Sequence, residues 1–261
     1  MGNGVKAAKV MRCDQSTISR KVLDNCKFFN IELQKEKGEW NILGDVSLIN
    51  KQRALHQIYR LNGYAPKRIS LPINFRGITS KPIGQGWHGY IDRILNPLWK
   101  LELLRQSIVD AILCTEADEI PAVAAEDFHC IQIASKELRL ITNKEQISEN
   151  TGKNIQVTPL PVLVPDNNFW PLRSNQLRLT GHKLKSAAGH RYSEKNWEEP
   201  INLNKALRLG NIYDLKINPN WAFAGLPYTI NSKITLITKK ELGNKEPIIE
   251  LSKRLLMATQ D

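Results

Sequence analysis

The sequence predicts an α/β fold in which a small helical unit and one long helix precede a larger domain of strands and helices. Three observations predict it. Apolar residues recur at helical spacing over residues 6–28, with a break at Cys13-Asp14. Residues 46–61 contain neither Gly nor Pro, and after residue 66 strand-like apolar segments alternate with helical ones. At 261 residues and 41% hydrophobic content, the chain can form more than one core.

Residues 6–30 predict two helices joined by a tight turn. Asp14 is a good N-cap residue, so the second helix is expected to start at about Gln15, with Ile18, Val22 and Cys26 facing inward. Polar side chains surround its first turns: Gln15, Ser16, Thr17, Ser19, Arg20 and Lys21. Such side chains at a helix N-terminus can reach base edges in the major groove of DNA. The alternative is a helical hairpin with a polar outer face and no nucleic-acid partner.

Residues 31–43 change to the alternation of a β-hairpin, with a turn at Lys37-Gly38. Lys35 and Lys37 could contact phosphates there, or the hairpin could serve only to close the small core.

Residues 46–61 predict a long helix with one apolar stripe, which consists of Leu48, Leu55, Ile58 and Tyr59. The stripe could pack against a copy from a second chain or against its own domain.

The turn signals at residues 62–66 mark the expected domain boundary. Beyond it we expect a mostly parallel sheet. Strands are predicted at 68–75, 98–101, 109–114, 128–133 and 138–142, and helical segments at 87–95 and 102–107. Residues 155–231 are rich in Pro and Asn, and Trp170, Trp197 and Trp221 are the expected core aromatics of this stretch.

The N-terminal residues resemble the LysR-type transcriptional regulators. The family's paired alanines, leucine, small apolar residue, glutamine, valine, Ser-Arg and isoleucine correspond to Ala7-Ala8, Met11, Cys13, Gln15, Ile18, Ser19-Arg20 and Val22. The likeness weakens after Val22, and Glu36 stands where the family's wing has an arginine. Weak similarity continues through Leu103 to Ile112 and Leu138 to Ile141. Ile234 to Lys240, followed by a helix at 247–256, resembles the family's return to its first lobe.

This resemblance implies a winged helix-turn-helix at 1–45, a dimerising linker helix at 46–63, and a two-lobed effector-binding domain like the periplasmic binding proteins at 67–261. Lobe I would comprise about 67–154 and 232–261, and lobe II about 155–231. The family's first helix is expected to be missing, since only residues 1–6 precede the paired alanines. The implied partners are double-stranded DNA, a small-molecule effector and further copies of the chain, as a dimer or tetramer. The implied location is the nucleoid of a prokaryotic cytoplasm.

Within this scheme Gln15, Thr17 and Arg20 should face base edges, while Lys21 and Lys27 should meet phosphates. The expected DNA-binding residues are Gln15, Ser16, Thr17, Ser19, Arg20, Lys21, Lys27 and Lys35.

Residues 84–89 satisfy the dinucleotide-binding pattern G-x-G-x-x-G, although Pro82 rather than a strand precedes them. They could form a nucleotide site, a purely structural loop, or part of the effector site that the resemblance implies between the lobes. In the last case Thr79, Ser80, Gly84 and Gly86 would hold a small, anionic ligand.

The remaining composition favours a binding protein over an enzyme. The net charge of +11 favours polyanionic partners, and residues 1–60 contain eleven Lys or Arg against six Asp or Glu. The four cysteines lack metal-site spacing and are expected to be buried free thiols, and the basic run 181–191, with His182 and His190, has no metal motif. No membrane-spanning run and no nucleophile motif occurs. We therefore expect no enzyme activity, no metal and no cofactor other than an unknown effector. The alternatives are a small-molecule-binding protein that has lost operator binding, and a nucleotide-binding enzyme that uses residues 84–89.

Overall fold

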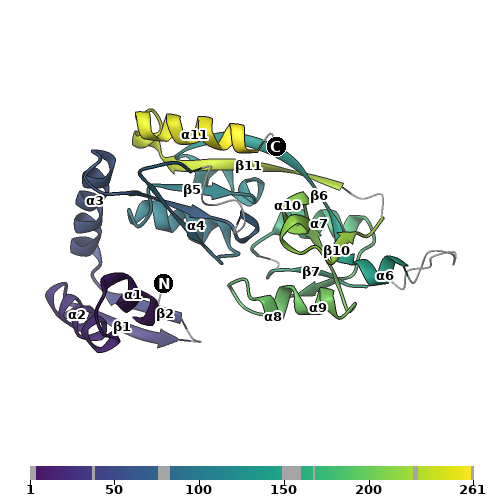
Figure 1. The fold of residues 1–261 in the computed structure, drawn as a ribbon, viewed down its shortest axis with the longest axis horizontal. Coiled ribbons are helices and arrows are strands. Elements are labelled where there is room, and N and C mark those ends of the chain that lie inside the picture. The colour runs from purple at the N-terminus through teal and green to yellow at the C-terminus, as the bar shows by residue number, and fades with distance from the viewer. Residues whose placement is uncertain are drawn as a thin grey trace. The chain divides into compact units, whose positions relative to one another are not determined.

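The computed structural model describes residues 4–36, 39–75, 83–148, 160–166, 168–225 and 229–259. The chain forms two compact units, Met1–Ile58 and Tyr59–Asp261. Figure 1 shows their helices and strands.

The first unit consists of two helices, a hairpin and most of a third helix. α1 (Gly4–Met11) and α2 (Gln15–Phe28) are joined through Arg12, whose φ of 51° turns the chain sharply. β1 (Ile31–Glu36) and β2 (Glu39–Gly44) pair antiparallel. The predicted helices and hairpin are thus confirmed, whereas the predicted turn at Lys37-Gly38 lies outside the described residues.

The core of this unit is small. Ala8, Phe29 and Ile31 are buried, and Ile18 is half-buried. The expected inward position of Val22 is wrong, because 41% of its surface is exposed. Asp14 occupies the N-cap of α2 as expected, but its side chain makes no capping hydrogen bond. Its backbone oxygen instead accepts from the N–H groups of Thr17 and Ile18.

α3 (Ser47–Leu61) is the predicted long helix, and its last three residues belong to the second unit. Asp45 begins it by accepting hydrogen bonds from Ser47 N at 2.8 Å and Ser47 Oγ at 2.9 Å. The apolar stripe is exposed, with 64% of the surface of Leu55 and 56% of that of Ile58 accessible.

The second unit contains one mixed sheet, in which the described strands follow the order β4-β3-β5-β11-β6-β9-β7-β8, with β10 also paired to β6. The strands are β3 (Lys67–Leu71), β4 (Trp87–Ile91), β5 (Ala111–Cys114), β6 (Phe128–Asn143), β7 (Val162–Val164), β8 (Leu184–Ser186), β9 (Leu207–Gly210), β10 (Trp221–Phe223) and β11 (Thr229–Lys239). Parallel pairs such as β3–β5 and β7–β9 occur beside antiparallel pairs such as β5–β11 and β6–β9. The expectation of a mostly parallel sheet is therefore wrong.

Helices cover both faces of this sheet. They are α4 (Pro97–Arg105), α5 (Ala122–Ala125), α6 (Lys144–Ser148), α7 (Pro171–Leu179), α8 (Glu194–Trp197), α9 (Glu199–Asn202), α10 (Ile212–Ile217) and α11 (Glu246–Ala258), with single 3-10 turns η1 (Ile73–Phe75), η2 (Ala117–Glu119) and η3 (Lys240–Leu242). Figure 1 shows α11 lying along β11.

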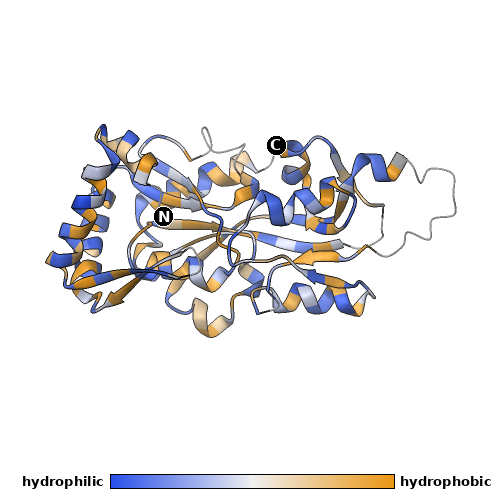
Figure 2. Cartoon of the chain, turned by 90° about the horizontal axis from the view of Figure 1, so that it is seen from below, coloured by the Kyte–Doolittle hydropathy of each residue, from blue (hydrophilic) through white to orange (hydrophobic). Residues whose placement is uncertain are grey.

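The central strands are buried on both sides, which explains their continuous apolar runs. In β5, Ala111 and Leu113 face the core beneath α11, while Ile112 and Cys114 face the core beneath α4. Figure 2 shows the hydrophobic strands between helices of mixed polarity. This alternation is the period of two that a strand imposes.

β6 and β11 are the two long strands that join the halves of the second unit. They pair from Thr229↔Arg139 to Lys239↔Phe128, with an irregularity at Ile234/Thr235. The sequence predicted two strands where β6 is one, because the polar residues 135–137 were read as a break although they lie within the ladder. We call β3–β5 with α4, η2 and α11 lobe I, and β7–β10 with α7–α10 lobe II.

Two further elements differ from the prediction. Residues 87–91 form strand β4, not a helix, because they extend the sheet in parallel register with β3. Residues 98–101 lie in helix α4, not in a strand, since Asn96 caps the helix through Leu98 N at 2.9 Å and Pro97 occupies its first turn. Asn96-Pro97 was taken as a helix end, but Pro is equally suited to a helix start.

Candidate functional site

The polar N-terminal surface of α2 is exposed as the sequence suggested. Gln15, Ser16, Ser19, Arg20 and Lys21 are all exposed. Thr17 is half-buried, and Lys27 and Lys35 are exposed further along α2 and on β1. These donors lie on one small unit without competing ion pairs to the described carboxylates.

Two packing details affect how far individual side chains can reach. The Gln15 side chain lies against Gly4, where an added Cβ would be 3.4 Å from Gln15 Cγ. Lys35 Nζ lies 6.0 Å from the centre of the Trp40 ring, close to the outer limit of a cation–π contact. No residue of α2 is buried, and Leu23 and Phe28 are 58% and 73% exposed.

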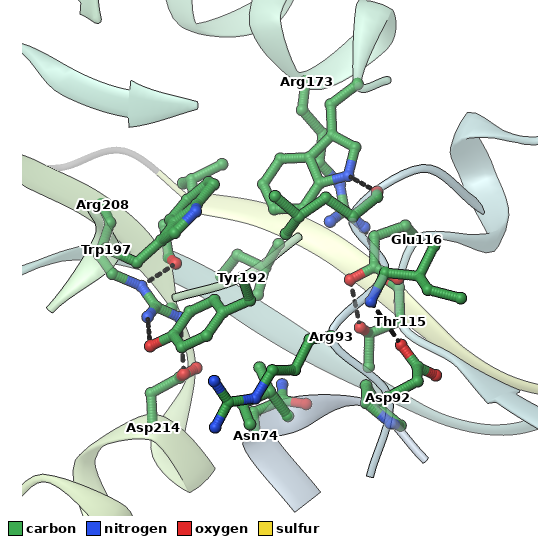
Figure 3. A pocket seen from close by; sticks show the side chains of 18 of the residues that line it. Asn74, Asp92, Arg93, Thr115, Glu116, Arg173, Tyr192, Trp197, Arg208 and Asp214 are labelled. Atoms are coloured by element: carbon green, nitrogen blue, oxygen red, sulfur yellow. Dashed lines mark hydrogen bonds and ion pairs between the residues drawn. The ribbon is translucent and has the colours of Figure 1, made fainter. Parts of the chain in front are cut away.

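A cavity between the lobes is the second candidate site (Figure 3). It lies where the chain leaves the carboxyl ends of β3, β4, β5 and β9, the edge at which α/β sheets commonly bind ligands. Its volume is about 70 Å³, which holds about five water molecules. The lining residues from lobe I include Ile73, Asn74, Asp92, Arg93, Ile94, Leu95, Lys100 and Glu116, and those from lobe II include Trp170, Arg173, Tyr192, Trp197, Arg208 and Asp214.

Lys100 is buried within a cluster of carboxylates on the lobe I side. Its Nζ lies 2.9 Å from Glu116 Oε2 and 4.0 Å from Asp92 Oδ1. Burial alone would lower the pKa of Lys100, but the charges of Glu116 and Asp92 outweigh burial and raise this pKa above its usual value. Asp92 also accepts hydrogen bonds from Ser70 Oγ and Ile94 N. The positive charge of Lys100 is therefore balanced by carboxylates of the protein itself.

The two carboxyl groups in this cluster respond oppositely. Burial raises the pKa of Asp92 despite the nearby charge of Lys100. Burial also acts to raise the pKa of Glu116, but Lys100 and Arg173, together with a hydrogen bond from Thr115 Oγ1, lower it below its usual value. Burial raises the pKa of Cys114 to about 12, so this neighbouring thiol stays protonated.

Arg173 joins the lobes at one side of the cavity. From the first turn of α7 its Nη2 donates to Thr115 O at 2.6 Å and to Asp118 Oδ1 at 2.8 Å. The backbone of α7 also donates to lobe I, because Glu119 accepts hydrogen bonds from the N–H groups of Leu172 and Arg173, both at 2.9 Å. The Glu119 carboxylate thus satisfies the helix N-terminus of α7 across the lobe boundary.

Arg208 is held on the lobe II side. Its Nη2 donates to Asp214 Oδ1 at 2.7 Å and its Nη1 donates to Tyr192 Oη at 3.3 Å, as the dashed lines in Figure 3 show. The guanidinium also lies over the ring of Trp221 at 5.4 Å. Burial is the main cause that raises the pKa of Tyr192, whose hydroxyl donates to Glu198 Oε1 at 2.7 Å.

Arg93 and Asn74 differ from these residues, because their side chains make no hydrogen bond or ion pair with the described residues. Asn74 Oδ1 is buried without a partner. The Arg93 side chain is exposed to the cavity, and no dashed line reaches its guanidinium in Figure 3.

Of the predicted effector residues, the two that the structure describes lie away from this cavity. Thr79 and Ser80 lie outside the described residues. Gly84 and Gly86 do not line the cavity, because Gly86 O accepts from Lys67 N at the opposite end of β3. Both glycines have positive φ, of 72° and 80°, so the turn itself requires them.

The nucleotide interpretation of residues 84–89 is contradicted. A dinucleotide loop must open a helix whose N-terminus meets the pyrophosphate, whereas this loop leads into strand β4. A Cβ on Gly84 would also lie 1.7 Å from Arg254 Nη1 of α11, so the loop is packed against protein.

Sequence reasoning missed Asn74, Asp92, Arg93, Lys100 and Glu116 as cavity residues. A signal existed for Glu116, which follows the correctly predicted strand β5, because side chains at carboxyl ends of strands meet at one edge. Asp92 and Arg93 could not be found in this way, since the strand before them was predicted as a helix.

The described ranges contain no cluster of three His, Cys, Asp or Glu side chains suited to a metal ion, and no helix long and apolar enough to cross a membrane. The four cysteines are free. Cys114 is buried as expected, but Cys130 is exposed, so the expectation of four buried thiols is wrong.

The sequence matches no protein-family model and no curated protein. Solved structures nevertheless match almost the whole fold. ArgP from Mycobacterium tuberculosis superposes with a TM-score of 0.54 at 10% identity, covering 99% of this chain and 92% of that chain. Full-length CbnR in complex with its target DNA superposes with a TM-score of 0.55 at 17% identity, covering 98% of this chain and 94% of that chain.

The C-terminal domains of a LysR family protein from Agrobacterium tumefaciens superpose with a TM-score of 0.52 at 10% identity, covering 75% of this chain and 97% of that chain. At identities this low, the likeness establishes the fold, which is that of full-length LysR-type regulators.

Proposed function

We propose that this chain, which has the fold of the LysR-type regulators, is a DNA-binding transcriptional regulator controlled by a small-molecule effector in the cavity between its lobes. The observation that carries the proposal is the exposed polar N-terminal end of α2, in a fold that matches DNA-bound CbnR over 98% of the chain. In this proposal α1 and α2 are the helix-turn-helix, β1 and β2 are the wing, and α3 is the linker.

The charges of the first unit support contact with a duplex. Arg20, Lys21 and Lys27 of α2 are exposed, and Lys35 stands on β1. Lysines and arginines that neutralise phosphates release counterions, so binding should weaken steeply with salt. Gln15 and Arg20 have the donor geometry that reads base edges, whereas Lys21 would contact phosphate.

The effector would act through the lobe angle. Arg173 and Glu119 already connect the lobes beside the cavity, so a ligand there would favour one arrangement of the lobes over another. The end of α3 is fixed to lobe I through Arg60, whose Nη2 lies 2.8 Å from Asp110 Oδ1. A change in lobe I would therefore reach the helix that continues into the first unit.

The proposal is tested with DNA from upstream of the protein's own gene and a scrambled duplex, across a salt series. Gln15→Ala should lose about 1 to 3 kcal/mol on the cognate DNA alone, and Lys21→Ala should weaken both DNAs and lower the salt slope by about one. Lys253→Ala, an exposed lysine of α11, is the matched control and should change neither.

Two results would count against the proposal. Absence of retention on either DNA at low salt would refute DNA binding. Equal losses on both DNAs for Gln15→Ala would show that α2 does not read sequence.

A second candidate is a small-molecule-binding protein that has kept the lobes but lost operator binding. The observation that favours it is that α2 has no buried residue, with Leu23 and Phe28 largely exposed, so the proposed reading helix has little support. Ligand binding together with no DNA retention would select this function.

A further inference from the structure

We propose that the cavity takes a small organic monocarboxylate and that Arg93 determines this specificity. The inference rests on the proposed function, since it names the class of effector that the same cavity would bind. It follows from which charged groups in the cavity are already paired and which are not.

Three of the four cations that line the cavity are neutralised within the protein. Lys100 pairs with Glu116, Arg173 with Asp118, and Arg208 with Asp214. Loss of Lys100 or Arg208 would leave the buried carboxylate of Glu116 or Asp214 uncompensated, and loss of Arg173 would do the same to the buried Glu119, which lies 3.8 Å from its Nε. These residues therefore shape the cavity but have no charge to offer a ligand.

Arg93 is the fourth cation, and the described residues leave its guanidinium without a partner. Its backbone is fixed, because Arg93 O accepts from Tyr192 N at 2.7 Å across the lobe boundary. A fixed arginine with a free planar guanidinium can bind a carboxylate through two parallel hydrogen bonds.

The surrounding charges limit the ligand to a single negative charge. Glu116 and Asp214 are balanced by Lys100 and Arg208, so an anion of higher charge such as phosphate would carry negative charge that no free cation of the lining balances, and Asp92 would add to the repulsion. One unpaired guanidinium balances one carboxylate.

Size and lining define the rest of the ligand. A volume of about 70 Å³ excludes a nucleotide and suits a molecule that displaces about five waters. Trp170, Trp197 and Ile94 supply apolar walls. Asn74 Oδ1, which is buried beside Arg93 without a hydrogen-bond partner, can accept from a hydroxyl or amino group elsewhere on the ligand, because an ionised carboxylate has no proton to donate.

The test uses the full-length protein and isosteric pairs of probes that differ in charge, namely propionate with propionamide and benzoate with benzamide, plus inorganic phosphate. Because Trp170 and Trp197 line the cavity, tryptophan fluorescence reports binding there. We expect each carboxylate to bind at least about tenfold more tightly than its amide. Arg93→Gln should reduce carboxylate affinity about 10- to 100-fold, to the level of the amide.

Two variants serve as controls. Arg93→Lys should recover part of the carboxylate affinity, because it restores the charge but not the planar fork. Arg105→Gln, which removes the same charge from an exposed arginine of α4 outside the cavity lining, should have no effect.

The inference is overturned if amides bind as tightly as carboxylates, if phosphate binds more tightly than either, if Arg93→Gln leaves carboxylate affinity unchanged, or if no carboxylate binds. DNA retention by the same preparation separates these failures from a failure of the proposed function, because it depends on α2 and not on Arg93.

Discussion

The buried ion pair between Arg60 and Asp110 should be among the most sensitive points of the second unit. Arg60 Nε and Nη2 donate to the two oxygens of Asp110, both at 2.8 Å, and Arg68 N donates to Asp110 Oδ2 at 2.8 Å. Asp110 is 0% exposed and Arg60 is 3% exposed. A buried ion pair therefore holds the end of α3 to Asp110, the residue that directly precedes β5 of lobe I.

Asp110→Ala should cost about 3 to 5 kcal/mol, because it leaves the Arg60 guanidinium buried and uncompensated. Arg60→Met should cost a similar amount, because it leaves the Asp110 carboxylate buried and uncompensated. In a domain of this size each kcal/mol lowers the Tm by about 2 to 4 °C, so each variant should lose about 6 to 20 °C. The double variant should cost clearly less than the sum, since no lone buried charge remains.

Urea unfolding followed by tryptophan fluorescence, with calorimetry to separate the two units, measures these losses. Glu102→Ala is the matched control, because its ion pair with Arg105 is exposed and should contribute less than about 1 kcal/mol. The reasoning fails if each single variant stays within about 1 kcal/mol of the unmodified chain, or if the double variant costs the full sum.

The other predictions concern the cavity carboxylates and the exposed stripe of α3. Because the folded pKa of Glu116 lies below 4.5, its ionised form stabilises the fold, and this contribution disappears as pH falls through that pKa. Glu116→Gln should thus lower the Tm at pH 7, with a difference that shrinks in acid. The folded pKa of Asp92 is raised above 3.8, so Asp92→Asn should raise the Tm at pH 7, and this gain should disappear in acid. The Tm of each variant is measured against the unmodified chain from pH 3 to 8. Changes in Tm at pH 7 that have the same sign for Glu116→Gln and Asp92→Asn would contradict these pKa directions. If the stripe forms a dimer seam, Leu55→Asp and Ile58→Asp should convert a dimer to a monomer in light scattering, since each buries an unpaired charge. A monomer already in the unmodified chain would rule this out.

Local pattern was enough to predict the first unit. The apolar spacing before and after Asp14, and the alternation that begins at Ile31, correctly placed α1, α2 and the hairpin. The exposure of Val22 was not predictable, because helical spacing indicates an apolar face but not whether another element covers it.

In the second unit, local pattern predicted β5 and mistook β4 and the start of α4, while the likeness to the LysR-type regulators indicated α11 and the second half of β11. The residues of β4 have no strong period, and only their parallel pairing with β3 makes them a strand. Asn-Pro occurs both at the start of helices and just after their ends, so the sequence around Asn96-Pro97 does not distinguish the two cases. In the structure Asn96 caps the start of α4.

The sequence by itself determined the elements whose own residues fix their period, and the resemblance to the LysR-type regulators that rests on residues 7–22. Only the tertiary structure decided the cavity. Asn74, Arg93, Glu116 and Arg208 are far apart in the chain and meet because the carboxyl ends of four strands reach one edge. Only the tertiary structure, likewise, shows that Arg173 and Arg208 are neutralised while the Arg93 guanidinium has no partner among the described residues, because ion pairing depends on distances between side chains that no local pattern contains.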